Sequence, residues 1–154
     1  MARRGLWIPV VLGTCALLVL GDGAATGQGG GATCFGKQAT LAYPDTQFVV
    51  GTQNADVIVT DDRVQLIDGR EGDDLICAGG GRDLVGGAAG NDLIAGEGGK
   101  DNLAGGKGND RLFGNRGVDL LNGNTGRDRC AGGPGFDVAS PRTCESVRSA
   151  VTRL

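Results

Sequence analysis

Between residues 51 and 140 the hydrophobic pattern repeats every nine positions, without insertion or deletion. Position eight of each row is apolar or small: Ile58, Ile67, Ile76, Val85, Ile94, Leu103, Leu112, Leu121, Cys130 and Ala139. The last three positions of a row fit a very short strand, in which position eight points inward and positions seven and nine point out. The pattern predicts an all-β repeat structure whose thin core becomes continuous when rows stack.

Polar and glycine positions keep the same phase. Position six is Asp in nine of ten rows, the exception being Gln65, and position four is Gly from Gly72 through Gly135. Position one is mostly Gly as well. Glycine tolerates positive φ and lets backbones pass closely, which suits a turn over the first six positions. A disordered glycine-rich linker would hold no such register, so the pattern favours stacked repeats.

Composition excludes several functions. The chain has 31 glycines, 4% aromatic residues and no histidine, which removes His-based acid–base catalysis, Ser–His triads and His-ligated zinc. No HExxH or G-x-S-x-G motif is present, and the carboxylates belong to the repeat, so we expect no enzyme activity. A formal net charge of −3 argues against nucleic acid as a partner.

The N-terminus has the pattern of a secretory signal peptide. Arg3 and Arg4 precede an apolar run from Leu6 to Leu20, and small residues follow. We expect cleavage after Ala25 and a secreted, extracellular protein with no membrane contact afterwards. An uncleaved membrane anchor is the alternative, although the run is short for a span of about 20 apolar residues. The remaining cysteines are Cys34, Cys77, Cys130 and Cys144, an even number that predicts two disulfides with three possible connectivities.

The chain therefore divides into four predicted segments. Residues 1–25 are the signal peptide, 26–50 a Gly-rich linker and N-terminal cap, 51–140 the repeats, and 141–154 a C-terminal cap. In the last segment Val147, Val151 and Leu154 fit helical spacing, but the segment is too short to decide.

Each row approximates G-G-x-G-x-D-x-U-x, where U is a large apolar residue, and residues 105–113 match it fully. Residues 34–145, including Cys34-Phe35-Gly36-Lys37 and Cys144-Glu145, resemble the bacterial hemolysin-type (RTX) calcium-binding repeat family. The resemblance implies a right-handed parallel β-roll, a β-helix solenoid with short caps and 18 residues per coil. It also favours the bridges Cys34–Cys77 and Cys130–Cys144, which keep one bridge at each end of the roll.

The resemblance further implies Ca²⁺ between stacked turns, held by Asp carboxylates and by glycine carbonyls. The implied carboxylate ligands are Asp56, Asp74, Asp83, Asp92, Asp101, Asp110, Asp119, Asp128 and Asp137. The implied turn glycines are Gly72, Gly81, Gly90, Gly99, Gly108, Gly117 and Gly126. Six to eight oxygens suit this hard cation. A single Asp could equally cap its own turn, but turn formation does not require one residue type in register. Unneutralised Asp columns repel, so folding and metal binding should be one event.

The two sides of the roll should differ in strength. On one side Asp56, Asp74, Asp92, Asp110 and Asp128 stack, and position five there reads Ala55, Asp73, Asn91, Asn109 and Arg127. The other side begins with Gln65, and its position five reads Arg82, Lys100, Val118 and Phe136. We therefore expect weaker calcium sites on the second side. Asn54 and Gln65 make the first two rows atypical terminal repeats.

The sequence predicts a secreted calcium-binding repeat protein that folds on binding calcium. The alternative is an extracellular adhesion or structural surface protein in which calcium serves only folding. Positions seven and nine, taken together, show no Thr array or aromatic stripe that would support an adhesion surface. A toxin is disfavoured, because no membrane-inserting segment follows the signal. Calcium ions are the only partner that the sequence identifies.

Overall fold

The computed structural model describes residues 32–43, 46–140 and 142–148, and for 146–148 it describes the backbone only. The predicted signal peptide and its alternative, a membrane anchor, lie outside the described residues. Within the described part of the chain, no helix is long and apolar enough to cross a membrane.

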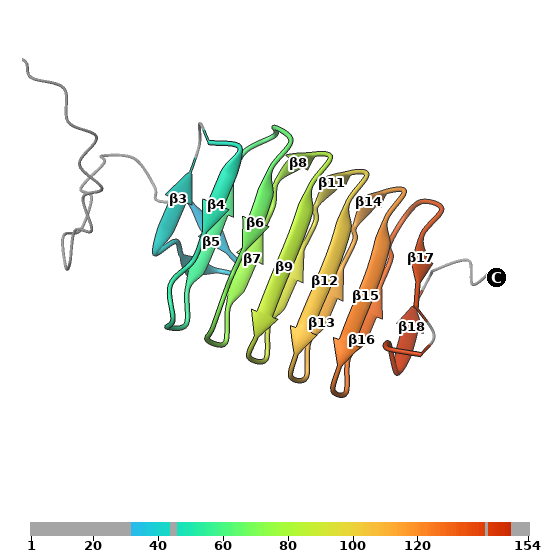
Figure 1. The fold of residues 1–154 in the computed structure, drawn as a ribbon. Helices are drawn as coiled ribbons and strands as arrows, with labels where there is room; N and C mark the ends of the chain where they lie inside the picture. Colours follow the sequence, from blue (N-terminus) through green and yellow to red (C-terminus); the bar gives the residue numbers. More distant parts are fainter. Residues whose placement is uncertain (1–31, 44–45, 141, 149–154) are drawn as a thin grey trace, which may run out of the picture.

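The described chain forms strands joined by turns, without helix, as the nine-residue pattern predicted (Figure 1). A seven-stranded parallel sheet has the order β18-β16-β13-β10-β7-β5-β3. Its strands are β3 (Leu41–Tyr43), β5 (Val57–Thr60), β7 (Leu75–Cys77), β10 (Leu93–Ala95), β13 (Arg111–Phe113), β16 (Arg129–Ala131) and β18 (Ser146–Arg148).

A six-stranded parallel sheet, β17-β15-β12-β9-β6-β4, forms the opposite wall. Its strands are β4 (Phe48–Val50), β6 (Leu66–Asp68), β9 (Leu84–Ala89), β12 (Asn102–Lys107), β15 (Leu120–Thr125) and β17 (Val138–Ala139). A three-stranded sheet, β8 (Gly80–Gly81), β11 (Gly98–Gly99) and β14 (Arg116–Gly117), lies along one line of turns. The antiparallel hairpin of β1 (Thr33–Cys34) and β2 (Lys37–Gln38) precedes the coils.

Two nonapeptides make one coil. Ile94 pairs with Ile76 on one side and with Leu112 on the other, a register of 18 residues that holds for the repeat strands of both sheets. Residues 51–140 thus form a β-solenoid of five coils, which confirms the β-roll expected from the sequence. Successive rows alternate between the sheets, so every second turn stacks on the same side (Figure 1).

The core is a double file of position-eight side chains between the two main sheets. All ten position-eight residues are buried, and the predicted inward orientation is confirmed. Val49 extends the file by one residue at the N-terminal end. One residue per strand is a small apolar core, and stability depends on continuous stacking because each coil buries its faces only against its neighbours.

Both ends are fixed by disulfides, with the predicted pairing. Cys34 in β1 bonds to Cys77 in β7, and Cys130 in β16 bonds to Cys144, each with a Cα–Cα distance of 5.6 Å. The first bridge holds the β1–β2 hairpin against the outer face of the seven-stranded sheet, where Phe35 and Phe113 lie 6.1 Å apart between ring centroids.

The C-terminal segment adds a strand and not a helical turn at Ser146–Arg148. β18 pairs in parallel with β16, and Val147 stands opposite Cys130. The spacing of Val147, Val151 and Leu154 fits a helix, but Val147 lies in a strand. The edge of β16 offers main-chain hydrogen bonds that a strand can use. Val151 and Leu154 lie outside the described residues.

Candidate functional site: two stacks of aspartate turns

The position-six residues form two columns, one at each edge of the solenoid. We call the turns that carry Asp56, Asp74, Asp92, Asp110 and Asp128 the first turn stack; each leads into a strand of the seven-stranded sheet. The turns that carry Gln65, Asp83, Asp101, Asp119 and Asp137 are the second turn stack and lead into the six-stranded sheet. The structure thus brings together all nine sequence-predicted Asp residues, in two separate columns.

One oxygen of each stacked carboxylate is used by the fold itself. The backbone N–H of Asp74 donates to Oδ1 of Asp92 at 2.9 Å, and the N–H of Asp92 donates to Oδ1 of Asp110 at 2.9 Å. The same bond recurs in the second turn stack, from Asp83 N–H to Asp101 Oδ1 at 2.9 Å. Each of these carboxylates therefore accepts a hydrogen bond from the turn of the preceding coil and does not cap its own turn.

The other carboxylate oxygen has no hydrogen-bond partner. Oδ2 is buried without one in Asp74, Asp83, Asp92, Asp101, Asp110, Asp119, Asp128 and Asp137. Asp56 differs, because its Oδ2 accepts from the N–H of Thr52 at 2.7 Å and from its hydroxyl at 3.0 Å. A buried, unpaired carboxylate oxygen is costly unless a cation or proton neutralises it.

The position-one glycines mark a small space lined by oxygen. A Cβ atom on Gly69 would lie 2.5 Å from Oδ2 of Asp74 and 2.9 Å from the carbonyl oxygen of Gly87 in the next coil. These distances are shorter than real Cβ atoms show, so glycine is needed here for space. One carboxylate oxygen and one carbonyl oxygen, from two successive coils, thus border the same gap.

The position-four glycines are needed for a second reason. Gly90 has a φ of +146°, and a Cβ there would strike the carbonyl oxygen of Gly72, one coil earlier. Gly99 stands in the same relation to Gly81 in the second turn stack. Asn54 and Arg63 occupy this position in the first coil, as expected of atypical terminal repeats; Gly72 and Gly81 pack onto their main chains.

Burial makes the carboxylates poor acids in the metal-free fold. Burial away from water raises the pKa of Asp92 to about 7, although the Asp74 N–H bond lowers it, and the charges of Asp110, Asp74 and Asp73 raise it further. Burial likewise raises the pKa of Asp83 to about 7 and those of Asp74 and Asp101 to about 6. The columns therefore favour a bound positive charge, whether a proton or a metal ion.

The two stacks differ at position five. In the first turn stack the backbone N–H of Asn91 donates to Oδ1 of Asp73 at 2.7 Å, and the N–H of Asn109 donates to Oδ1 of Asn91 at 2.9 Å. In this side-chain ladder the position-five N–H groups donate to side-chain oxygens and not to the position-four carbonyls. In the second turn stack the N–H groups of Lys100 and Val118 donate to the carbonyls of Gly81 and Gly99, each at 3.2 Å.

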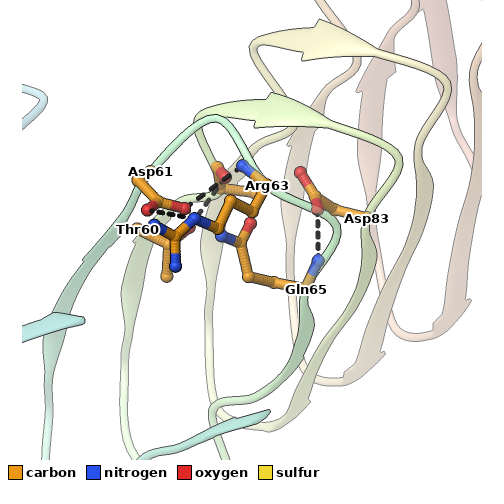
Figure 2. A network of polar contacts seen from close by, with 6 residues as sticks. Thr60, Asp61, Arg63, Gln65 and Asp83 are labelled. Atoms are coloured by element: carbon orange, nitrogen blue, oxygen red, sulfur yellow. Dashed lines mark hydrogen bonds and ion pairs between the residues drawn. The ribbon is translucent and has the colours of Figure 1, made fainter. Parts of the chain in front are cut away.

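Protein groups fill the first step of the second turn stack (Figure 2). The side-chain amide of Gln65 donates to Oδ1 of Asp61 at 2.5 Å, and Nε of Arg63 lies 3.4 Å from Oδ2 of Asp61. The Thr60 hydroxyl donates to the Ala78 carbonyl at 2.7 Å, and the Gln65 N–H still caps onto Asp83 at 2.7 Å. The Gln65 amide thus stands where other rows present Asp, and the Arg63 guanidinium pairs with Asp61 beside it.

The oxygen set fits a calcium ion. Within the described ranges, no three His, Cys, Asp or Glu side chains gather closely enough to hold a metal on their own. A cation here would need main-chain carbonyls beside the carboxylates, and Ca²⁺ accepts both kinds of oxygen in a flexible shell of six to eight ligands. The unpaired Oδ2 atoms and the oxygen-lined gap beside Gly69 supply such donors.

Sequence reasoning found the columns but missed three features. It did not predict the N–H to Oδ1 bond between coils, which depends on side-chain orientation. It considered position five for its charge and bulk, whereas Asp73, Asn91 and Asn109 also form a ladder. It pooled the outward residues of both sheets, although the register places Leu66, Leu84 and Leu120 in one line on the six-stranded sheet. Reading the rows alternately, every 18 residues, would have revealed that line.

Comparison with protein families gives one match. The family model described as RTX calcium-binding nonapeptide repeat (4 copies) matches residues 50–85, 87–112 and 105–139. No curated protein and no solved structure was found to match the chain. The matched residues are those that form the coils and both turn stacks. The chain therefore belongs to the family of RTX calcium-binding nonapeptide repeat proteins.

Proposed function

We propose that the protein is secreted and that its solenoid folds when Ca²⁺ binds between stacked turns. The observation that carries this proposal is the set of eight buried Asp Oδ2 atoms without a hydrogen-bond partner. In each site the Asp carboxylates of two coils and the turn carbonyls would hold the ion. The negative charge that opposes stacking then stabilises it, so binding and folding are coupled.

The first turn stack should contain the stronger sites. Its position-five ladder keeps the N–H groups of Asn91 and Asn109 away from the carbonyls of Gly72 and Gly90. Those carbonyls thus avoid a competing donor. The best pairs are 74/92 and 92/110, because both have glycine turns and Asp or Asn at position five.

The second turn stack should bind calcium more weakly for two physical reasons. Its position-four carbonyls already accept main-chain hydrogen bonds from Lys100 and Val118. The exposed side chains of Arg82 and Lys100 also place positive charge beside the carboxylates, which lowers affinity for a cation even when water screens part of the effect. The pair of Gln65 and Asp83 lacks one carboxylate and should be the weakest of all.

Secretion is supported by the residues at 1–25 and by the two disulfides. Disulfides persist in oxidising compartments, where millimolar calcium is also common. Export before folding would bring the chain to calcium while it is still unstructured. The alternative is a surface or adhesion protein in which calcium serves only folding. The exposed apolar side chains of Leu66, Leu84 and Leu120 support it.

A calcium titration of the chain lacking residues 1–25, followed by circular dichroism, tests the proposal. We expect a largely disordered spectrum in chelator and a gain of β signal at about 10⁻⁴–10⁻³ M calcium, the range of extracellular modules. Magnesium at equal concentration is the matched control, since its small octahedral shell suits carbonyl-rich turns poorly. A β spectrum that persists unchanged in excess chelator would refute calcium-coupled folding.

A further inference from the structure

The outer face of the six-stranded sheet carries an apolar line that nothing in the described chain covers. Position seven of its strands reads Phe48, Leu66, Leu84, Asn102, Leu120 and Val138, which stand next to one another in register and are all exposed. Val64, Val118 and Phe136 are exposed at position five of the same turns. Contiguous exposed apolar residues on a folded protein mark interaction sites.

The two lines border a groove along the second turn stack. It has a volume of about 670 Å³, and its walls are position-five and position-seven side chains. Val64 and Leu66 lie at the N-terminal end, whereas Val118, Leu120 and Val138 lie at the C-terminal end. The two coils between them place Arg82 beside Leu84 and Lys100 beside Asn102. We call this the outer groove; its position-five residues from Val64 to Val118 are apolar, cationic, cationic and apolar.

The seven-stranded sheet provides the contrast. Its outer apolar residues Val57, Val59 and Leu75 pack with Cys34 of the β1–β2 hairpin, which the Cys34–Cys77 bridge fixes in place. The chain thus covers the apolar part of one outer face with its own segment. On the other face, the described residues provide no such segment over Leu84 or Leu120, both of which remain exposed.

From this arrangement we propose that the outer groove binds an extended peptide segment of another protein, with acidic residues at its centre and apolar residues on both sides. Charge complementarity carries the choice of partner. The carboxylates along the groove, Asp83, Asp101 and Asp119, are buried, so the exposed charges in it are the cations Arg82 and Lys100. The distance from Leu66 to Val138 is four coil spacings, roughly 19 Å, or about six extended residues.

Other occupants fit the groove less well. A second copy related by a twofold axis would place the cationic centre against itself, which costs affinity. A fatty acid carries its charge at one end, whereas the cations here lie between two apolar ends. The two terminal segments outside the described residues, 1–31 and 149–154, carry Arg3, Arg4 and Arg153 against Asp22 alone, so they lack the required negative charge.

The test measures binding of three synthetic peptides to the calcium-saturated protein. The peptides share flanking Leu, Val and Phe residues and differ at the centre, which is Asp-Glu, Asn-Gln or Lys-Lys. Wild-type protein should bind the acidic peptide several-fold more tightly than the neutral one and the lysine peptide most weakly. The double variant Arg82→Glu/Lys100→Glu should reverse this order. Equal binding of all three peptides, or binding of none, overturns the proposal.

Matched controls separate the groove from general electrostatics. Arg111 and Arg129 are exposed at position seven of the other main sheet, so Arg111→Glu/Arg129→Glu changes the net charge equally and should leave the order intact. Reversal in this control as well would refute a specific groove. Leu84→Asn/Leu120→Asn introduces the residue type that Asn102 already places in the same line. It should weaken binding of the acidic peptide without reversing the order, and it serves if the charge variant fails to fold.

Two further outcomes would count against a peptide partner. Sedimentation that shows a wild-type dimer abolished by Leu84→Asn/Leu120→Asn would assign the groove to a second copy. Displacement of the acidic peptide by dodecanoate, together with tighter binding of dodecanoate than of the peptide, would assign it to an anionic amphiphile. Because all measurements use saturating calcium with the fold verified by circular dichroism, failure here is distinguishable from failure of calcium-coupled folding.

Discussion

Asp92 occupies the centre of the first turn stack, and its replacement should damage calcium-driven folding most. Its Oδ1 accepts from Asp74 N–H, its own N–H donates to Asp110, and its Oδ2 lies unpaired. It belongs to both proposed best sites, 74/92 and 92/110. Asp137 ends the second turn stack, belongs to one site, and accepts from Asp119 N–H at 3.0 Å. We therefore expect Asp92→Ala to raise the calcium midpoint far more than Asp137→Ala.

The magnitude follows from two separable losses. Either Ala variant leaves one buried N–H without its acceptor, which costs about 1–3 kcal/mol. A site at 100 times its dissociation constant adds about 2.7 kcal/mol of stability. Asp92→Ala weakens two such sites and Asp137→Ala one, so their difference should approach the contribution of one site. Asp92→Asn keeps an acceptor for Asp74 N–H and should lose only the metal-dependent part.

The assay is a calcium titration of each variant by circular dichroism, in the chain lacking residues 1–25. The expected order of midpoints is wild type, Asp137→Ala, Asp92→Asn, Asp92→Ala. Equal midpoints for Asp92→Ala and Asp137→Ala, or the reverse order, would show that the two-stack ranking is wrong. Equal midpoints for Asp92→Asn and Asp92→Ala would show instead that the hydrogen bond between coils contributes nothing measurable.

Three other outcomes are expected from the same geometry. Burial raises the pKa of Asp74, Asp83, Asp92 and Asp101 from 3.8 to about 6–7, so protonation stabilises the metal-free fold below about pH 4, and this stability is lost as pH rises through about 6–7. A calcium-free β signal that does not increase on acidification contradicts this. Gly90→Ala should raise the calcium midpoint strongly, because residue 90 has positive φ and the added methyl group would strike the Gly72 carbonyl. Gly98→Ala, where the space is open, is the control, and equal midpoints for the two variants would refute the close approach. In excess chelator, hydrogen exchange should be slower around Thr52, Asp56 and Gln65 than around Asp110, because Asp56 accepts from the Thr52 N–H and the Gln65 amide donates to Asp61. Uniform exchange would argue against a first coil that forms without calcium.

The repeat period determined most of the fold in advance. A phase of nine with one inward apolar residue admits few structures, and the two-row coil with both disulfides followed from it and from the family resemblance. The candidate ligands followed from the Asp column for the same reason. The difference between the turn stacks in their hydrogen bonds did not follow from the sequence. It depends on whether the position-five N–H donates to a side chain, as Asn91 does to Asp73 Oδ1, or to a carbonyl, as Lys100 does to that of Gly81. Sequence spacing does not specify that choice.

The outer groove and the calcium columns are two consequences of one register. Leu84 follows Leu66 by 18 residues and Leu120 follows Leu84 by 36, and the three come into one line only when successive coils stack. A one-residue slip would turn position seven inward and position eight outward, which would remove the apolar line and the core together. The position-six carboxylates fix that register through a hydrogen bond to each preceding coil. Calcium bound in the first turn stack would therefore also assemble the groove on the opposite sheet, so peptide binding should disappear in chelator along with the fold.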